Sequence, residues 1–192
     1  MKKALFLIII FFCTISNISA ENIKRIAIGN ADAKISIIAF ESLTCSHCAN
    51  FHKEIFPDLK KNYLDTGLAK IEFRHFPLDI AAFNASKVSQ CNNDGDSKIL
   101  NSLFANQQKW VKGSSASEAN QNLKKFLESE GFNLDFEACI NNKEIEDFVL
   151  NDRIDGVKNY KINSTPTIII NDKKFEKSLN YKNLKKALEK LI

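Results

Sequence analysis

The chain has 192 residues, of which 44% are hydrophobic, enough for a sizeable core in one domain or in one domain with a large insertion. The 15 phenylalanines, against 6 glycines and 3 prolines, favour helices and buried strands over a loop-rich fold. The formal net charge is only +4 and the lysines are scattered along the sequence, which argues against a nucleic-acid-binding protein.

The first 20 residues have the composition of a cleaved secretory signal peptide. Lys2 and Lys3 give a basic start, an almost unbroken apolar run covers residues 4–13, and Ala20 offers a cleavage edge. The apolar run is about half the ~20 residues that span a bilayer, so an uncleaved anchor helix is the less favoured alternative. We therefore expect a protein that is exported to the periplasm, without stable insertion in a membrane.

The next elements surround a pair of cysteines. Residues 35–40 form an apolar run typical of a buried strand, residues 45–62 have helical periodicity, and residues 69–73 predict a second strand. These elements predict a right-handed β-α-β unit with parallel strands. Cys45 and Cys48 lie at the first junction, where their spacing allows a reversible disulfide across the first helical turn. One face of the helix carries Cys48, Phe51, Ile55, Leu59 and Tyr63.

The start of this helix predicts an acidic thiol at Cys45. Free amide groups and the helix dipole stabilise negative charge there, which lowers the pKa of a thiol from about 8.5. The His47 ring could donate a hydrogen bond to the thiolate or add positive charge. We expect Cys45 to be the attacking and attacked sulfur, and Cys48 to be the less exposed resolving sulfur.

A zinc site is the alternative use of two cysteines at this spacing. Zinc needs further ligands at short spacing, and the sequence has no second C-x-x-C motif. His52 and His75 are expected to be packed or surface residues, so we expect no metal and no cofactor beyond the Cys45–Cys48 disulfide.

Residues 78–160 show helical periods without strand-like alternation, and predict about four helices inserted into the α/β domain. The chain then returns to a β-branched strand at 165–170, a turn at 171–173 and a short returning strand at 174–176. An amphipathic helix closes the chain with Leu184, Ala187, Leu188 and Leu191.

Cys91 and Cys139 lie in the helical block. We favour a structural disulfide between them, which would close a long loop and add roughly 4 kcal/mol of stability. A second redox pair and two buried free thiols are the alternatives. Trp110, in the same block, is expected in the core or in a groove wall.

These motifs resemble the DsbA-like family of thioredoxin-fold thiol–disulfide oxidoreductases. The resemblance is carried by the signal-like start, the helical block, Phe40-Glu41-Ser42 before Cys45-Ser46-His47-Cys48, Phe76-Pro77-Leu78, and Gly156-Val157 leading to Ser164-Thr165-Pro166-Thr167. It implies an α/β thioredoxin-like fold with an inserted α-helical domain: a thioredoxin part at 21–77, the insert at 78–160 and a second thioredoxin part at 161–192.

The resemblance also implies a site and partners. Pro166 is expected to follow a cis peptide bond opposite the cysteines, which leaves the Thr165 backbone free to pair with an extended peptide. His47 is expected to hold the thiolate, and Ser46, with His47, to tune the redox potential. The implied activity is protein disulfide oxidation by a monomer that acts on reduced or unfolded client proteins and is reoxidised by a DsbB-like membrane quinone reductase.

Two positions depart from the family pattern. Some members carry a buried acid six residues before the first cysteine, where this chain has Ala39, and Ser46 replaces a common proline. Glu41 is either a surface residue or a proton shuttle.

Two rival functions stay open. One is an isomerase or reductase, although isomerases of this type add an N-terminal dimerisation domain that the short lead before residue 35 leaves no room for. The other is a non-catalytic chaperone or adhesion module that binds peptides in the groove near Pro166.

Overall fold

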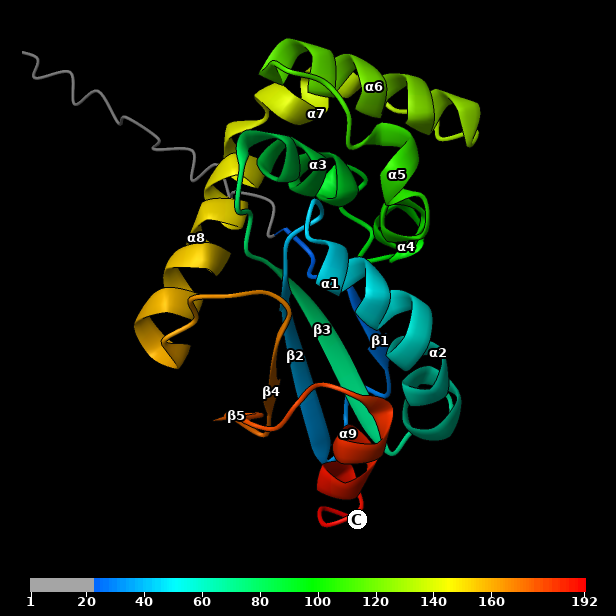
Figure 1. Cartoon of the computed structure of the whole chain (residues 1–192), viewed down its shortest axis with the longest axis vertical. Coiled ribbons are helices and arrows are strands. Elements are labelled where there is room, and N and C mark those ends of the chain that lie inside the picture. The colour runs from blue at the N-terminus through cyan, green and yellow to red at the C-terminus, as the bar shows by residue number, and fades with distance from the viewer. Residues whose placement is uncertain (1–22) are drawn as a thin grey trace, which may run out of the picture.

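A central five-stranded sheet organises the protein, in a computed structural model that describes residues 23–192. The predicted signal peptide, residues 1–20, lies outside the described residues. The strand order is β1-β3-β2-β4-β5; β2 and β3 are parallel, as predicted, and the other pairs are antiparallel (Figure 1). The strands are β1 Ala27–Gly29, β2 Ile35–Glu41, β3 Ala69–His75, β4 Thr167–Ile170 and β5 Lys173–Lys174.

Strand β2 is buried on both faces, because helices cover the sheet on either side. Ile37 and Ala39 belong to the large core beneath the cysteine-bearing helix, whereas Ile38 and Phe40 belong to a smaller core on the opposite face. Successive side chains of a strand alternate between faces. Glu41 therefore shares the face of Ala39, one pleat closer to the cysteines.

The segment after β2 is helical from residue 46 to residue 64, but it is not one regular α-helix. Two wider π-helical turns interrupt it, so the elements are α1 Ser46–Asn50, η1 Phe51–Ile55, α2 Phe56–Leu59 and η2 Lys60–Leu64. Pro57 lies within this stretch and has no backbone N–H to donate to the preceding turn, which favours such irregularity. The predicted inward face is nevertheless confirmed, since Cys48, Phe51, Ile55, Leu59 and Tyr63 are all buried.

Six helices lie between β3 and β4 in the described chain, where the sequence predicted about four. Two of them, α5 and α7, are only four and six residues long, too short to show a helical period. Figure 1 shows this block stacked on one end of the sheet, with α8 returning along the sheet's side. The helices are α3 Ile80–Gln90, α4 Lys98–Ala105, α5 Gln107–Trp110, α6 Ala116–Ser129, α7 Phe136–Asn141 and α8 Lys143–Tyr160.

Strand β1 was not predicted, because it has only three residues and its ends are exposed. The hairpin of β4 and β5 is present, although β5 is shorter than the predicted strand. Helix α9, Tyr181–Leu188, buries Leu184 and Leu188, whereas Leu191 lies beyond its end and is 41% exposed. The prediction that Leu191 packs on the inward face was wrong for that reason.

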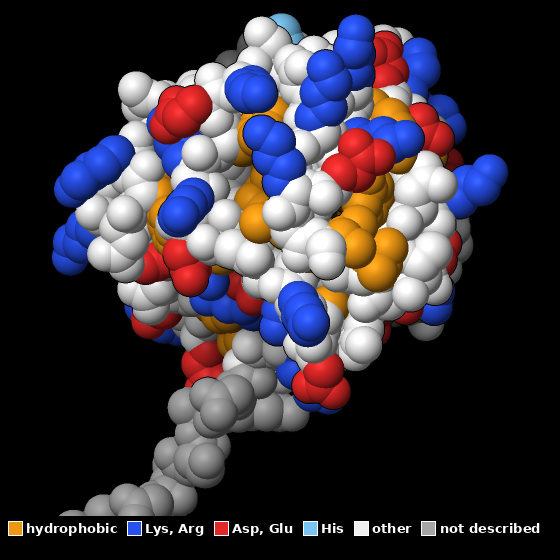
Figure 2. Space-filling model, turned by 90° about the horizontal axis from the view of Figure 1, so that it is seen from below, with side chains coloured by type: hydrophobic (Ala, Val, Ile, Leu, Met, Phe, Trp, Pro, Cys, Tyr) orange, Lys and Arg blue, Asp and Glu red, His pale blue; other side chains and the backbone are white. Residues whose placement is uncertain are grey.

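Lysines gather at the end of the molecule away from the helical block. Residues 171–192 hold seven lysines and three acidic residues. Their net charge of +4 equals the formal net charge of the whole chain. Figure 2 shows the molecule from this end, with many Lys and Arg side chains around a few apolar ones. Within residues 23–192, none of the helices is both long enough and apolar enough to span a membrane.

Candidate active site

Cys45 lies at the junction of the sheet and the first helix. It is the N-cap residue of α1, with extended backbone angles, and its carbonyl oxygen accepts hydrogen bonds from the amides of Cys48 and Ala49. Its half-buried thiol donates to the Thr165 carbonyl oxygen at 3.4 Å, and the Thr165–Pro166 peptide bond is cis. The loop before β4 therefore meets the cysteine motif although 120 residues separate them.

The two thiols have very different acidities. The pKa of Cys45 is lowered from 9.0 to about 5, first by a hydrogen bond from the Cys48 thiol, then by the Thr165 side chain and by the backbone amides of Cys48 and His47. Cys48 is fully buried, and burial raises its pKa, with Cys45 and the Glu41 carboxylate adding to the increase. This arrangement places the negative charge of the dithiol form on the accessible sulfur.

The two residues between the cysteines point to the surface. Both Ser46 and His47 are exposed. In residues 23–192 the His47 ring makes no hydrogen bond to the Cys45 sulfur, and it is the backbone amide of His47 that lowers the Cys45 pKa. The predicted role of the ring stays a prediction.

Gln107 is a site residue that the sequence did not reveal. Its side-chain amide on α5 donates to the carbonyl oxygens of Leu43 at 2.8 Å and Cys45 at 3.1 Å. A second tether is the Thr44 hydroxyl, which donates to Asp79 at the start of α3 over 2.6 Å. The helical block thus holds both sides of the loop that presents Cys45.

Glu41 is buried, so its interpretation as a surface residue was wrong. Its carboxylate lies 2.9 Å from Nε2 of His52, and burial raises the pKa of the carboxyl while His52 lowers it. His52 is packed, with its ring stacked on Phe104 at a centroid distance of 4.1 Å. The alternation of strand β2 could have predicted this burial, since Glu41 follows Ala39 on the inward face.

Comparisons with known proteins agree with this geometry. A thioredoxin family model matches residues 21–190. The solved structure of Wolbachia pipientis alpha-DsbA1 is 29% identical, covers 87% of this chain and 90% of its own, and superposes with a TM-score of 0.77. The chain belongs to the thioredoxin family. Within that family it is a member of the DsbA-like thiol–disulfide oxidoreductases.

Curated relatives give the same assignment over different lengths. Disulfide bond formation protein D of Bacillus subtilis is 28% identical over 173 residues, which are 85% of this chain and 75% of that protein. A Rickettsia prowazekii protein, provisionally named protein-disulfide oxidoreductase, is 26% identical over 169 residues, 86% of this chain and 60% of its own. The chain spans between 31% and 61% of the five Rickettsia relatives that it matches.

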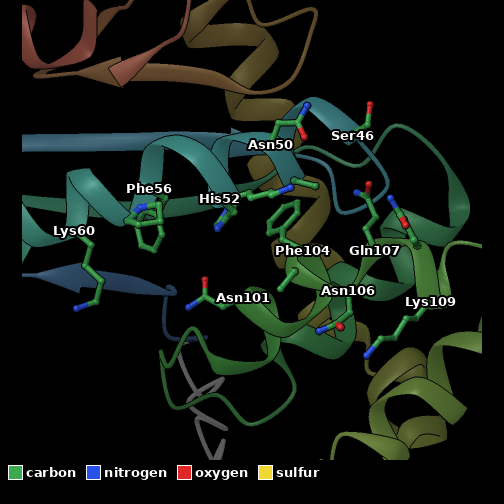
Figure 3. Close-up of a pocket in the computed structure, with 15 residues that line it drawn as sticks. Ser46, Asn50, His52, Phe56, Lys60, Asn101, Phe104, Asn106, Gln107 and Lys109 are labelled. Atoms are coloured by element: carbon green, nitrogen blue, oxygen red, sulfur yellow. The ribbon is translucent and has the colours of Figure 1, made fainter. Parts of the chain in front are cut away.

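A cavity of about 780 Å³ opens beside the active site of this DsbA-like chain, between the cysteine-bearing helix and the α4–α5 segment. Figure 3 shows His52 and Phe56 reaching into it from the first helix and Phe104 from the facing helix. Lys53 and Lys109 are further lining residues, and both are exposed. His52 therefore connects the buried carboxylate of Glu41 with an open space.

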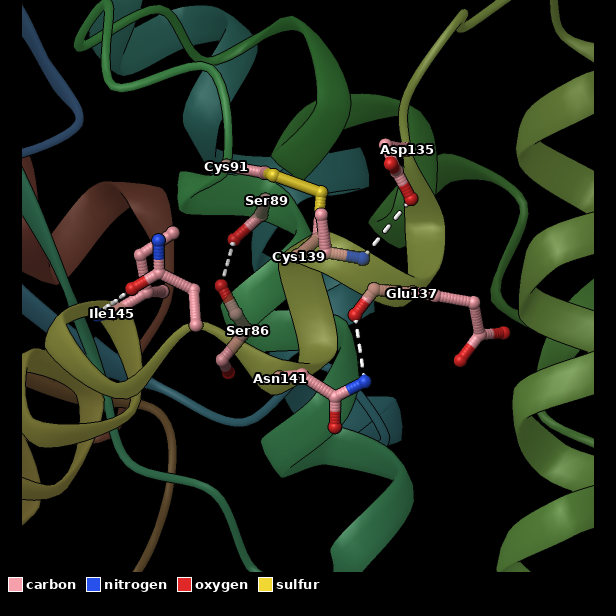
Figure 4. Close-up of a disulfide and its surroundings, with 10 residues drawn as sticks. Ser86, Ser89, Cys91, Asp135, Glu137, Cys139, Asn141 and Ile145 are labelled. Carbon is pink, nitrogen blue, oxygen red and sulfur yellow. Dashed lines mark hydrogen bonds between the residues drawn. A yellow bond between two sulfur atoms is a disulfide. The ribbon is translucent and has the colours of Figure 1, made fainter.

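Cys91 and Cys139 are joined in a disulfide with a Cα–Cα distance of 5.4 Å. The bond ties the C-terminal end of α3 to α7 within the helical block (Figure 4). The alternative of two free thiols is thereby wrong. Trp110 is in the core, where its indole N–H donates to the Leu103 carbonyl oxygen at 2.9 Å.

The histidines are not arranged around a metal. His75 is buried at the end of β3, its pKa is lowered by burial, and its backbone amide donates to Asp152. Among the residues that the structure describes, no three His, Cys, Asp or Glu side chains are grouped to hold an ion.

Proposed function

We propose that the protein is an exported protein-disulfide oxidoreductase that introduces disulfides into secreted or periplasmic proteins through Cys45-Ser46-His47-Cys48. The observation that carries this proposal is the contrast between an accessible, acidic Cys45 thiol and a buried, poorly acidic Cys48 thiol. The name of the Bacillus subtilis relative and the fold shared with Wolbachia pipientis alpha-DsbA1 support it.

The reaction is a two-step exchange that starts from a Cys45–Cys48 disulfide, and both residues are free thiols in this structure. A client thiolate attacks the accessible Cys45 sulfur, and Cys48 leaves. The second client thiol then attacks the client sulfur of this mixed disulfide and displaces Cys45. Cys45 is a good leaving group because its thiolate is stabilised, so the client leaves oxidised and the protein leaves reduced.

The direction of transfer follows from the same stabilisation. A thiol with a lowered pKa favours the reduced form over the disulfide, so the protein gives its disulfide away. The Thr165 carbonyl oxygen, 3.4 Å from the Cys45 sulfur, marks the position where an extended client backbone would pair.

The setting of the reaction belongs to the same proposal. The signal-like residues 1–20 favour export to the periplasm, and turnover there calls for a DsbB-like membrane quinone reductase. We further propose that the protein acts as a monomer and that its domains divide at 21–77, 78–160 and 161–192.

Trapping clients tests the proposal against its rivals. In Cys48→Ala, Cys45 is first loaded as a mixed disulfide with glutathione. A client with a single reduced cysteine then displaces glutathione as a thiolate and forms a mixed disulfide with Cys45 that no internal thiol resolves, so covalent adducts should accumulate that a reductant releases. Cys45→Ala is the matched control and should trap nothing. Equal client binding by both variants, without covalent product, would support the non-catalytic binding module instead.

An oxidation assay separates the oxidase from the isomerase or reductase. The oxidised protein should convert a reduced, unfolded client to its disulfide form in stoichiometric amounts. Reshuffling of scrambled disulfides without net oxidation would support the isomerase.

A further inference from the structure

The cavity of about 780 Å³ begins directly beside the reactive cysteine. One wall is the cysteine-bearing helix from Ser46 to Lys60, and the facing wall is formed by residues 101–109 of α4 and α5. Ser46 follows Cys45 in the chain, and Gln107 of the facing wall donates to the Cys45 carbonyl oxygen at 3.1 Å. A polypeptide joined to the Cys45 sulfur therefore lies at the mouth of this cavity.

The length of the cavity suits an extended segment of polypeptide. The helical wall from Ser46 to Lys60 is about 20 Å long at ~1.5 Å of rise per residue. An extended chain advances about 3.3 Å per residue, so about six residues match that length.

The floor of the cavity is aromatic. The rings of His52 and Phe56 come from the helix, and the ring of Phe104 comes from α4 (Figure 3). The His52 ring stacks on Phe104 with 4.1 Å between the centroids, and its centroid lies 5.3 Å from that of Phe56. Because aromatic rings pair well with other rings, this floor favours a large aromatic side chain.

The acidic and basic side chains that line the cavity carry only positive charge. Lys53, Lys60 and Lys109 are among the lining residues, which include neither Asp nor Glu. Lys60 and Lys109 form ion pairs with carboxylates outside the lining. Lys53 is exposed and forms no ion pair within residues 23–192. Such a rim attracts acidic residues of a ligand.

The two flanks of a client cysteine would meet different surfaces at this site. The Thr165 carbonyl oxygen lies 3.4 Å from the Cys45 sulfur, but none of the residues that line the cavity belongs to the Thr165 loop. One flank can therefore pair with the Thr165 backbone while the other passes Ser46 into the cavity.

We propose that this cavity is a client-binding subsite for one flank of the client's cysteine, and that it selects an extended segment with an aromatic side chain and acidic residues. The aromatic side chain lies on the floor, and the acidic residues face the lysines. This inference rests on the proposed function, because it names the clients that the exchange at Cys45 prefers.

The test is the rate at which reduced peptides displace glutathione from Cys45 in Cys48→Ala. Each peptide has one cysteine and a six-residue flank with one phenylalanine, and the other flank residues are acidic or basic. Per peptide thiolate, the acidic flank should react roughly 10-fold faster at low salt, and added salt should shrink this preference. The preference should hold for one side of the cysteine, and an equal preference on both sides would overturn the placement.

Charge reversal shows whether the cavity causes the preference. Adding Lys53→Glu and Lys109→Glu should reverse it, so that the basic flank reacts faster. Adding Lys61→Glu and Lys125→Glu is the matched control, because both lysines are exposed, lie outside the cavity and give the same change in net charge. An equal change in the two pairs, or no change in either, would overturn the subsite.

A photoreactive phenylalanine analogue in the acidic flank locates the flank directly. Once the peptide is joined to Cys45, irradiation should attach the analogue to residues 46–60 or 101–109. Attachment elsewhere on the protein, or to a second copy of the chain, would overturn the subsite.

The outcomes also separate the two proposals. A Cys45 that exchanges glutathione for none of the peptides would refute the proposed function. Exchange at equal rates with acidic and basic flanks would refute only the subsite. If circular dichroism shows that a charge-reversed variant is unfolded, the attachment sites in Cys48→Ala decide alone.

Discussion

Cys45 and Cys48 lie one helical turn apart, yet their pKa values move in opposite directions, because one thiol reaches the helix start and the other lies in the core. Thiolate absorbance of the dithiol protein should rise with a midpoint near pH 5, the value of the Cys45 pKa. Cys45→Ser should lose this transition. A single transition near pH 9.0, the ordinary thiol value, would contradict the assignment.

The lowered pKa of Cys45 also makes stability depend on pH. A group whose pKa falls on folding stabilises the folded state above its unfolded value, and this stabilisation is lost as pH falls through the folded value. The dithiol protein should therefore become less stable between pH 9.0 and about 5. The free energy of unfolding, measured with urea across this pH range, should fall more in the dithiol wild type than in Cys45→Ser. The same pH dependence in the two proteins would contradict this prediction.

Gln107 holds the loop before Cys45 through two backbone carbonyls. Gln107→Ala should lower the free energy of unfolding by about 1–2 kcal/mol, since both carbonyls lose their donor. Gln108→Ala is the control, because that side chain is exposed. Equal stability of the two variants in chemical denaturation would show that the tether contributes nothing.

Among the elements, α8 depends on one small residue to approach the sheet. A Cβ atom added to Gly156 would lie 2.9 Å from the ring of Phe40, which is fully buried. Gly156→Ala should therefore destabilise the protein by about 1–3 kcal/mol, and adding Phe40→Leu should recover part of that loss. If the losses of stability from Gly156→Ala and Phe40→Leu simply add in the double variant, the destabilisation by Gly156→Ala does not come from contact with the Phe40 ring.

The Cys91–Cys139 bond closes a loop of 48 residues across the helical block. Replacing both cysteines by alanine should lower the free energy of unfolding by roughly 4 kcal/mol, because the unfolded chain gains freedom. Thermal unfolding of the variant and the wild type measures this difference. A loss well below this size would mean that packing alone fixes α3 against α7.

Most elements could be predicted from the sequence, because their apolar periods are local. The apolar period of the first helix could be recognised in the sequence. Its two π-helical turns could not, because they change the backbone hydrogen bonds and leave the same side chains buried. Helices α5 and α7 and strand β1 are too short to show a repeated period, and contacts with α6, α3 and β3 hold them in place.

In the whole molecule, the active site exists only because distant segments meet. The pairing of Cys45 with Thr165 crosses 120 residues, and only family resemblance could predict it. The tether from Gln107 and the ring of His52 at the cavity depend on how the helical block sits on the sheet. Local sequence patterns carry no information about such contacts. The cysteine motif could be recognised because its residues are contiguous in the sequence.

The central claim is that a stabilised Cys45 thiolate makes the protein an oxidant, and equilibration with glutathione at defined ratios of its reduced and oxidised forms tests it most directly. We predict a reduction potential well above thioredoxin's value of about −270 mV. A potential near that of thioredoxin would contradict the account.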